Sequence, residues 1–186
     1  MDYIKGSIKD YLKDLAAKMP APGGGSAAAL SAAMGASLLA MTCNFTLGKE
    51  KYRKYEPRIK KILAQALSLE KRFIKLVDDD IRAYASGDME RAIGVPAEVC
   101  FLSYDLMKLA GEVMQKGNRR LVSDAALAAV LAETSFVAGY LYVEANLRLL
   151  KSGLGHYKGL EKDLKPLKRK IRAMRKKVEV KVGYSA

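Results

Sequence analysis

The sequence predicts an all-α protein, a bundle of about six helices around a buried, alanine-rich central helix. Its 186 residues, 50% of them hydrophobic, suit one domain with a sizeable core, so residues 1–186 are expected to fold as a single unit. Residues 26–47 form a long uncharged stretch rich in Ala, Leu, Ser and Met. Elsewhere the apolar residues recur with the 3.6-residue helical period, and no stretch has a convincing strand pattern.

The predicted central helix follows a glycine-rich turn. Because serine is a favoured N-cap, we expect the helix to start at Ser26 and Gly48 to cap its end. Free amides at a helix start, beside flexible glycines, predict a site for a carboxylate, a phosphate or a developing oxyanion. The residues of this predicted site are Gly23, Gly24, Gly25 and Ser26. Polar groups gather at the other end of the same helix, namely Asn44, Lys49, Lys51 and Tyr52.

Five further helices are expected around the central one. Pro96 lies inside one of them and predicts a kink or a restart. Ser123 is expected to cap the helix at residues 124–151, which is the fifth helix of the chain. Asp124 lies in the first turn of that helix, where the helix dipole stabilises a carboxylate. The five helices are predicted at residues 7–19, 57–85, 89–115, 124–151 and 160–182.

The net charge of +13 is concentrated in residues 49–75 and 157–186, which predicts attraction to a polyanion. Nucleic acid is one such partner, but recognition motifs and base-stacking aromatic residues are missing, so nucleic acid is not the expected partner. A folate with a polyglutamate tail is another polyanion. For the C-terminal run, a solvated helix face remains an equally good interpretation.

The cysteines, the single histidine and the N-terminal segment indicate which kinds of site and which cellular location to expect. Cys43 and Cys100 lie in apolar helical runs and are expected to be free thiols. The single His156, in a glycine-rich connection, gives no support to a zinc site or a catalytic triad. The N-terminus does not have a secretory pattern, and residues 24–47 are interpreted as a core helix rather than a membrane span, so we expect a cytoplasmic protein.

Three consecutive carboxylates, Asp78 to Asp80, stand in the C-terminal half of the predicted helix 57–85. The helix dipole disfavours negative charge there, so the cluster indicates either a functional use or a solvent-facing patch. The sequence pattern alone leaves both interpretations open.

Five ordered motifs resemble the family of formiminotetrahydrofolate cyclodeaminases and methenyltetrahydrofolate cyclohydrolases. They are PAPGGGSAAAL with CNFTLGKEKY (residues 20–30 and 43–52), VDDDIRAY (77–84), GVPAEV (94–99), KGNRRLVSDAALAAVLAE (116–133) and VEANLRLL (143–150). The connection before Pro96 is shorter than expected for this family, and Glu144 stands where an apolar residue is common.

The resemblance implies a folate enzyme without a metal or a tightly bound cofactor, whose substrate is a tetrahydrofolate derivative. The expected reaction is cyclisation of N5-formimino-tetrahydrofolate to 5,10-methenyl-tetrahydrofolate with release of ammonia. The alternatives are a methenyltetrahydrofolate cyclohydrolase, a non-catalytic helical module or a basic nucleic-acid-binding protein.

Because these reactions need a proton-transferring group, Asp80 and Asp124 are the predicted catalytic residues. Lys49 and Lys51 would hold the glutamate tail. A homodimer is expected through an apolar surface on the fourth and fifth helices, with the folate site near the interface. The remaining predicted substrate-binding residues are Gly23, Gly24, Gly25, Ser26, Asn44, Tyr52, Asp78, Asn118, Ser123 and Asn146.

Overall fold

The computed structural model describes residues 3–149, 157 and 159–183, and within these residues every regular element is helical. The predicted all-α class is therefore confirmed. The α-helices are α1 (Ile8–Ala16), α2 (Gly24–Asn44), α3 (Glu56–Ser86), α4 (Met89–Lys116), α5 (Val122–Leu149) and α6 (Leu160–Val182). Three 3-10 turns join them, η1 (Tyr3–Lys5), η2 (Glu50–Tyr55) and η3 (Arg119–Leu121). The expected end of the fifth helix at residue 151, and His156, lie outside the described residues.

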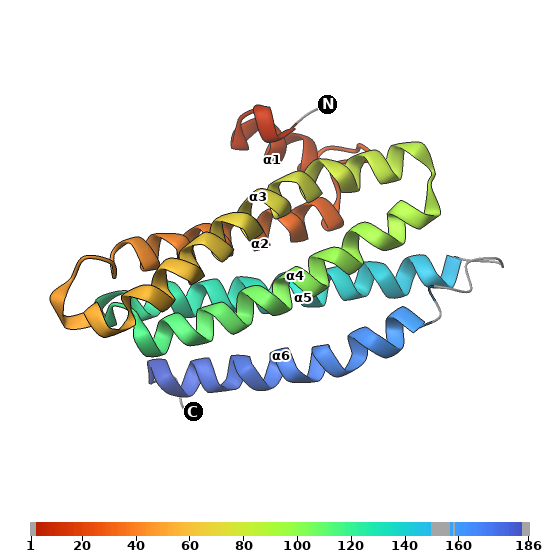
Figure 1. The fold of residues 1–186 in the computed structure, drawn as a ribbon. Coiled ribbons are helices and arrows are strands. Elements are labelled where there is room, and N and C mark those ends of the chain that lie inside the picture. Colours follow the sequence, from red (N-terminus) through yellow and green to blue (C-terminus); the bar gives the residue numbers. More distant parts are fainter. Residues whose placement is uncertain (1–2, 150–156, 158, 184–186) are drawn as a thin grey trace.

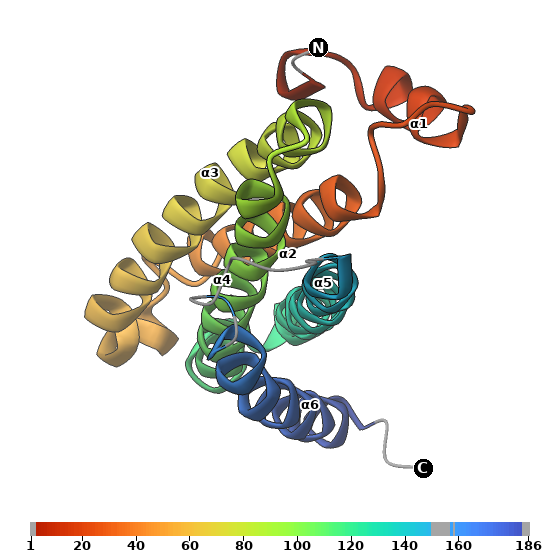
Figure 2. The same ribbon diagram turned by 90° about the vertical axis from the view of Figure 1, so that its right-hand side faces the viewer.

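The five long helices run alongside one another, and α1 lies at the end of the bundle where α2 starts (Figure 1). Seen from the side in Figure 2, α3 and α6 occupy opposite outer sides, with α4 between them. The alanine-rich α2 packs against α3, α4 and α5, as expected of a central helix. Small side chains let helix axes approach closely. The fully buried alanines of α2 and α5 that allow this include Ala29, Ala32, Ala36, Ala125, Ala128, Ala129 and Ala132.

Three predicted helix caps are wrong, and α1 ends at Ala16, three residues before the predicted residue 19. Helix α2 starts two residues before Ser26, with Gly23 as N-cap, and the Ser26 side chain is fully buried inside the first turn. At its other end α2 stops at Asn44, and Gly48 lies in the following turn with a left-handed φ of 71°. Ser123 does not cap α5, because the chain enters that helix directly from the η3 turn. The capping bond there is made by Asn118, whose side chain accepts the N–H of Arg120.

Pro96 neither stops nor restarts α4, which runs unbroken from Met89 to Lys116. Proline has no N–H, so the carbonyl of Ala92, four residues earlier, loses its usual helical partner. The side-chain amide of Asn146, on α5, donates to that carbonyl. Asn146 therefore holds α5 against α4 at the point where α4 lacks a bond of its own.

We expect Asn146→Ala to lower the free energy of unfolding by about 1–3 kcal/mol, because it leaves the carbonyl of Ala92 without a partner. The cost should be smaller in a Pro96→Ala background, where residue 96 regains an N–H. Urea denaturation of the parent, both single variants and the double variant measures the coupling. Equal costs in the two backgrounds would contradict this account of Asn146.

Candidate functional site

The start of α2 is a meeting point for side chains from other helices. A Cβ atom added to Gly25 would lie 2.2 Å from Oδ1 of Asp80, so the Asp80 carboxylate rests directly on the helix. The backbone N–H of Ser26, the third residue of α2, lies beside this carboxylate and lowers the pKa of Asp80. Asp80 thus occupies, from α3, the place beside the free amides that an N-cap side chain usually takes within one helix.

The anion site predicted at Gly23 to Ser26 therefore already contacts an anion of the protein itself. Burial raises the pKa of the Asp80 carboxyl above its ordinary value, and the N–H of Ser26 offsets part of the rise. The side chain is only partly buried, so it remains within reach of a bound molecule. A carboxyl whose pKa is raised is, when ionised, a stronger base than an ordinary aspartate.

Two tyrosines complete this end of the bundle. The Tyr142 ring, from α5, lies on Gly24, where an added Cβ would come within 2.0 Å of the phenol oxygen. From α1, the Tyr11 hydroxyl lies 3.1 Å from Oγ of Ser26, and both side chains are buried. Three elements, α1, α3 and α5, thus converge on the first turn of α2. We name Gly24, Gly25, Ser26, Asp80, Tyr11 and Tyr142 the helix-start cluster.

The three consecutive aspartates point in different directions and have different partners. Asp78 is 1% exposed and accepts the backbone N–H of Tyr3 at 3.1 Å, which anchors the N-terminal segment on α3. Asp79 pairs with Arg82 at 2.8 Å. Only Asp80 reaches the start of α2. Asp78, predicted to bind substrate, is buried beneath the N-terminal segment.

A second group of predicted residues lies at the other end of α2. The Asn118 backbone N–H donates to Oγ1 of Thr46 at 2.9 Å, and its side-chain amide donates to the carbonyl of Phe45 at 3.2 Å. The Tyr52 hydroxyl accepts the N–H of Arg119 at 3.0 Å. These bonds tie η2 and η3 to the end of α2, and they account structurally for Asn118 and Tyr52.

The exposed members of this end are available to a ligand. Asn44, Lys49, Lys51 and Ser123 are exposed, and Asp124 is half-buried in the first turn of α5. The Lys51 ammonium lies 5.9 Å from the centre of the Tyr52 ring. We name Asn44, Lys49, Lys51, Tyr52, Asn118, Ser123 and Asp124 the helix-end cluster.

The two clusters do not form one site within a single chain. Helices α2 and α5 are antiparallel, since Gly24 contacts Tyr142 whereas Gly35 lies against Ala128. Tyr142 and Asp124 are 18 residues apart on α5, which at 1.5 Å per residue separates their backbones by about 27 Å. The two predicted catalytic carboxylates, Asp80 and Asp124, therefore lie far apart in one chain. Asn146, at the joint between α4 and α5, belongs to neither cluster.

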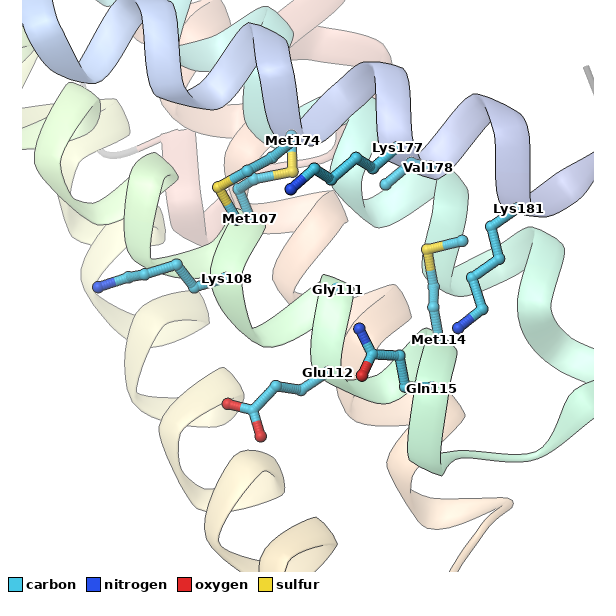
Figure 3. A pocket seen from close by; sticks show the side chains of 10 residues that line it. All are labelled: Met107, Lys108, Gly111, Glu112, Met114, Gln115, Met174, Lys177, Val178 and Lys181. Carbon is cyan, nitrogen blue, oxygen red and sulfur yellow. The ribbon is translucent and has the colours of Figure 1, made fainter. Parts of the chain in front are cut away.

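A groove between α4 and α6 contains none of the predicted site residues. Its volume is about 260 Å³, and Figure 3 shows Met107 and Met174 meeting between the two helices while Lys177 and Lys181 extend from α6 toward α4. Its methionine lining is typical of adaptable packing between an amphipathic helix and the bundle. The helix-start cluster, with its proton-exchanging carboxyl, is the better candidate for chemistry.

Two members of the helix-start cluster, Tyr11 and Tyr142, were not predicted from the sequence. Tyr11 lies on the apolar face of α1, where periodicity assigns it to the core. Tyr142 lies one residue before the last resembling motif and carries no pattern of its own. Only the contact with Gly24 and Ser26, which joins distant parts of the chain, identifies them.

Comparison with known proteins agrees with the motifs. The sequence model of the formiminotransferase-cyclodeaminase family matches residues 7–87 and 85–154. A methenyltetrahydrofolate cyclohydrolase from Methylorubrum extorquens is 32% identical, over 76% of this chain and 79% of the relative. The rat formimidoyltransferase-cyclodeaminase is 26% identical over 78% of this chain, which corresponds to only 31% of the rat protein.

The fold has a close counterpart as well. A crystal structure of a formiminotetrahydrofolate cyclodeaminase from Thermotoga maritima superposes with a TM-score of 0.81 at 23% identity, covering 96% of this chain and 94% of that one. The helical bundle is thus a folate-enzyme fold of one-carbon metabolism. The chain belongs to the formiminotransferase-cyclodeaminase family.

The contact between Gly25 and Asp80 can be tested by stability. Gly25→Ala should lower the free energy of unfolding by about 1–3 kcal/mol, because the new methyl group would overlap the carboxylate. The cost should fall, or reverse into the usual gain from Ala in a helix, in an Asp80→Ala background. Gly23→Ala is the matched control, since an added Cβ there meets nothing within 4 Å. Thermal or urea unfolding of these variants decides the matter, and an equal cost in both backgrounds would refute the contact.

Proposed function

We propose that this enzyme is a methenyltetrahydrofolate cyclohydrolase, which adds water to the 5,10-methenyl bridge and forms 10-formyl-tetrahydrofolate. The observation that carries the proposal is the 32% identity, over 79% of its length, to a protein of that name. In the proposed mechanism the Asp80 carboxylate accepts a proton from water as the water oxygen attacks the bridge carbon. Its raised pKa makes it a stronger base than an ordinary aspartate.

The second candidate is the cyclodeaminase reaction, favoured by the relatives from rat and mouse at 26% identity. There N10 of formimino-tetrahydrofolate attacks the amidine carbon and ammonia leaves. The reacting carbon is the same, and Asp80 would remove the proton from N10. The two candidates differ in substrate and leaving group rather than in the position of the base.

Assays of the purified protein with methenyl- and formimino-tetrahydrofolate distinguish the candidates. We expect faster turnover of the methenyl compound. Asp80→Asn should lower turnover by roughly 10²–10⁴-fold while substrate still binds, because asparagine keeps the acceptor for the Ser26 N–H but cannot accept a proton. Asp79→Asn, one residue away and directed at Arg82, is the matched control. Turnover of Asp80→Asn within threefold of the parent would exclude Asp80 as the base.

The two clusters can form one site if the protein is a symmetric homodimer, and the surface supports such an assembly. Of the predicted apolar surface on α4 and α5, we propose that the part on α5 forms the interface together with α2, because α3 and α6 flank α4 (Figure 2). The open apolar face belongs to α2 and α5, and in Figure 2 their side away from α4 is covered by no other described long helix. The exposed large apolar residues of these two helices include Met34 (49%) on α2 and Leu127 (46%) and Leu141 (56%) on α5.

This face is also consistent with the apolar character of its helices. Residues 24–44 and 119–149 are both long and apolar enough to cross a membrane by length and composition alone, but the same test is passed by core helices. Only 39% of the apolar window in residues 119–149 is buried within one chain. We propose that a second copy covers the remainder.

A two-fold axis near Met34, the midpoint of α2, would place the start of each α2 beside the end of the partner's α2. The helix-start cluster of one chain would then face the helix-end cluster of the other. Asp80 and Asp124 would belong to the same folate site, contributed by different chains. This arrangement explains why residues of one predicted site lie at opposite ends of a single helix.

Mixing two inactive variants tests the shared site. If both residues are required, Asp80→Asn and Asp124→Asn should each be inactive alone. After denaturation and refolding together, one site in each mixed dimer has both native residues, so activity should recover to about a quarter of the parent. Refolding each variant alone is the control. If the mixture gains no activity although mixed dimers form, the shared-site arrangement is wrong.

The lysines of the helix-end cluster should recognise the tail of the folate. Changing Lys49 and Lys51 together to Ala should weaken binding of a polyglutamyl folate more than that of the monoglutamate. Added salt should narrow the difference, because exposed charges are screened. Lys71→Ala, an exposed lysine on α3, is the control. Equal losses for both folates would rule out a tail-binding role.

A further inference from the structure

We infer that Tyr142 is a further catalytic residue, whose hydroxyl donates a hydrogen bond to the oxygen that the reaction adds to the folate carbon. Gly24 is the positioning residue that makes room for it. This inference rests on the proposed hydrolytic function. It gives a role to the Tyr142 hydroxyl, which lies in the helix-start cluster together with the Asp80 carboxylate.

The contact between Tyr142 and Gly24 leaves no space for a side chain at position 24. A Cβ atom there would lie 2.0 Å from the phenol oxygen and 2.7 Å from Cζ. Even alanine would have to displace the tip of the ring. Gly23, one residue earlier, has open space around it, so the requirement is specific to position 24.

Within the described residues the Tyr142 hydroxyl has no structural hydrogen bond, in contrast to the hydroxyls of Tyr3, Tyr11 and Tyr52. Tyr3 donates to Asp14 at 2.7 Å, Tyr11 bonds Ser26, and Tyr52 accepts from Arg119. Among the described residues, Tyr142 has no hydrogen-bond partner within the protein, and 39% of it is exposed. Its hydroxyl is therefore a donor that is held in place by packing and is open to a ligand.

Tyr142 and Asp80 contact successive residues of α2, Gly24 and Gly25, from two different helices. A hydrogen-bond donor and a base thus stand together at a helix start. Hydrolysis of a methenyl bridge can use this pair, since a base must take a proton from the attacking water, and a donor stabilises the negative charge that the added oxygen carries when the new hydroxyl later loses its proton.

Water bonds to the bridge carbon through its oxygen, one water proton passes to Asp80, and the π electrons of the amidinium group return to nitrogen. The new hydroxyl then loses its proton to solvent, the C–N5 bond breaks as the formyl carbonyl forms, and N5 receives the proton held by Asp80. In this second stage Tyr142 keeps its own proton and donates a hydrogen bond to the added oxygen while that oxygen carries negative charge.

Removing one such donor typically lowers turnover by about 10²–10³-fold. Tyr142→Phe should show this loss in kcat, with KM and the binding of a non-reacting folate such as 5-formyl-tetrahydrofolate changed little. Tyr84→Phe, an exposed tyrosine on α3, is the matched control. The melting temperature of Tyr142→Phe should stay near that of the parent, because the hydroxyl bonds nothing in the protein.

A double-variant cycle tests the role of Gly24. Gly24→Ala should lose turnover by displacing Tyr142, whereas Gly111→Ala on α4, where an added Cβ also meets nothing within 4 Å, should not. In a Tyr142→Ala background, which has no ring to displace, Gly24→Ala should cause no further loss. An additive effect of the two changes would overturn the positioning role of Gly24.

The outcomes separate this inference from the function on which it rests. If the parent turns over methenyl-tetrahydrofolate but Tyr142→Phe stays within threefold of it, or loses only binding, Tyr142 is not the donor while the hydrolase proposal stands. If the parent turns over neither folate, the proposed function fails and this inference fails with it.

Discussion

The contact between the Asp80 carboxylate and the first turn of α2 is the interaction on which the rest of the site depends. It fixes the position of α3 relative to α2 and keeps a charged group at the only place on α2 that stabilises a negative charge. It also explains the glycine run. Gly24 and Gly25 are needed because side chains from α5 and α3 occupy the volume where their own side chains would lie. The sequence pattern of this turn predicts a ligand site, but its glycines first allow side chains of other helices to pack against α2.

The chain's own carboxylate at the helix start does not compete with a catalytic use. Oxygen Oδ1 lies against Gly25, and the carboxylate as a whole is only partly buried, so an incoming molecule can still reach it. Partial burial raises the pKa, and the Ser26 amide limits that rise. The same contacts therefore hold the group still and adjust its affinity for a proton, and both effects favour proton transfer in a fixed geometry.

Much of the fold was accessible from sequence because it follows from local periodicity. The number of helices, the central place of α2 and the boundaries of α6 needed only the spacing of apolar residues and the positions of Gly and Pro. The starts of α2 and α5 were predicted wrongly because tertiary contacts override local capping preference. Ser26 has the chemistry of a cap, but its hydroxyl bonds Tyr11 and its capping role is filled by Asp80, 54 residues later in the chain. Neither Tyr142 nor the separation of Asp80 from Asp124 could be predicted, since both depend on how α5 lies along α2.

The three aspartates of α3 constrain how the chain length can vary. Successive residues on a helix differ by about 100° in direction, and here each of Asp78, Asp79 and Asp80 has its own partner. Inserting or deleting one residue just before them would rotate all three, so that Asp80 would leave α2 and Asp78 would leave the N-terminal segment. Length variation is instead tolerable immediately beyond α3, in the turn at Gly87, where the two parts of the family match meet. Relatives can thus differ in what projects from this end of the bundle while the register of α3 against α2 stays fixed.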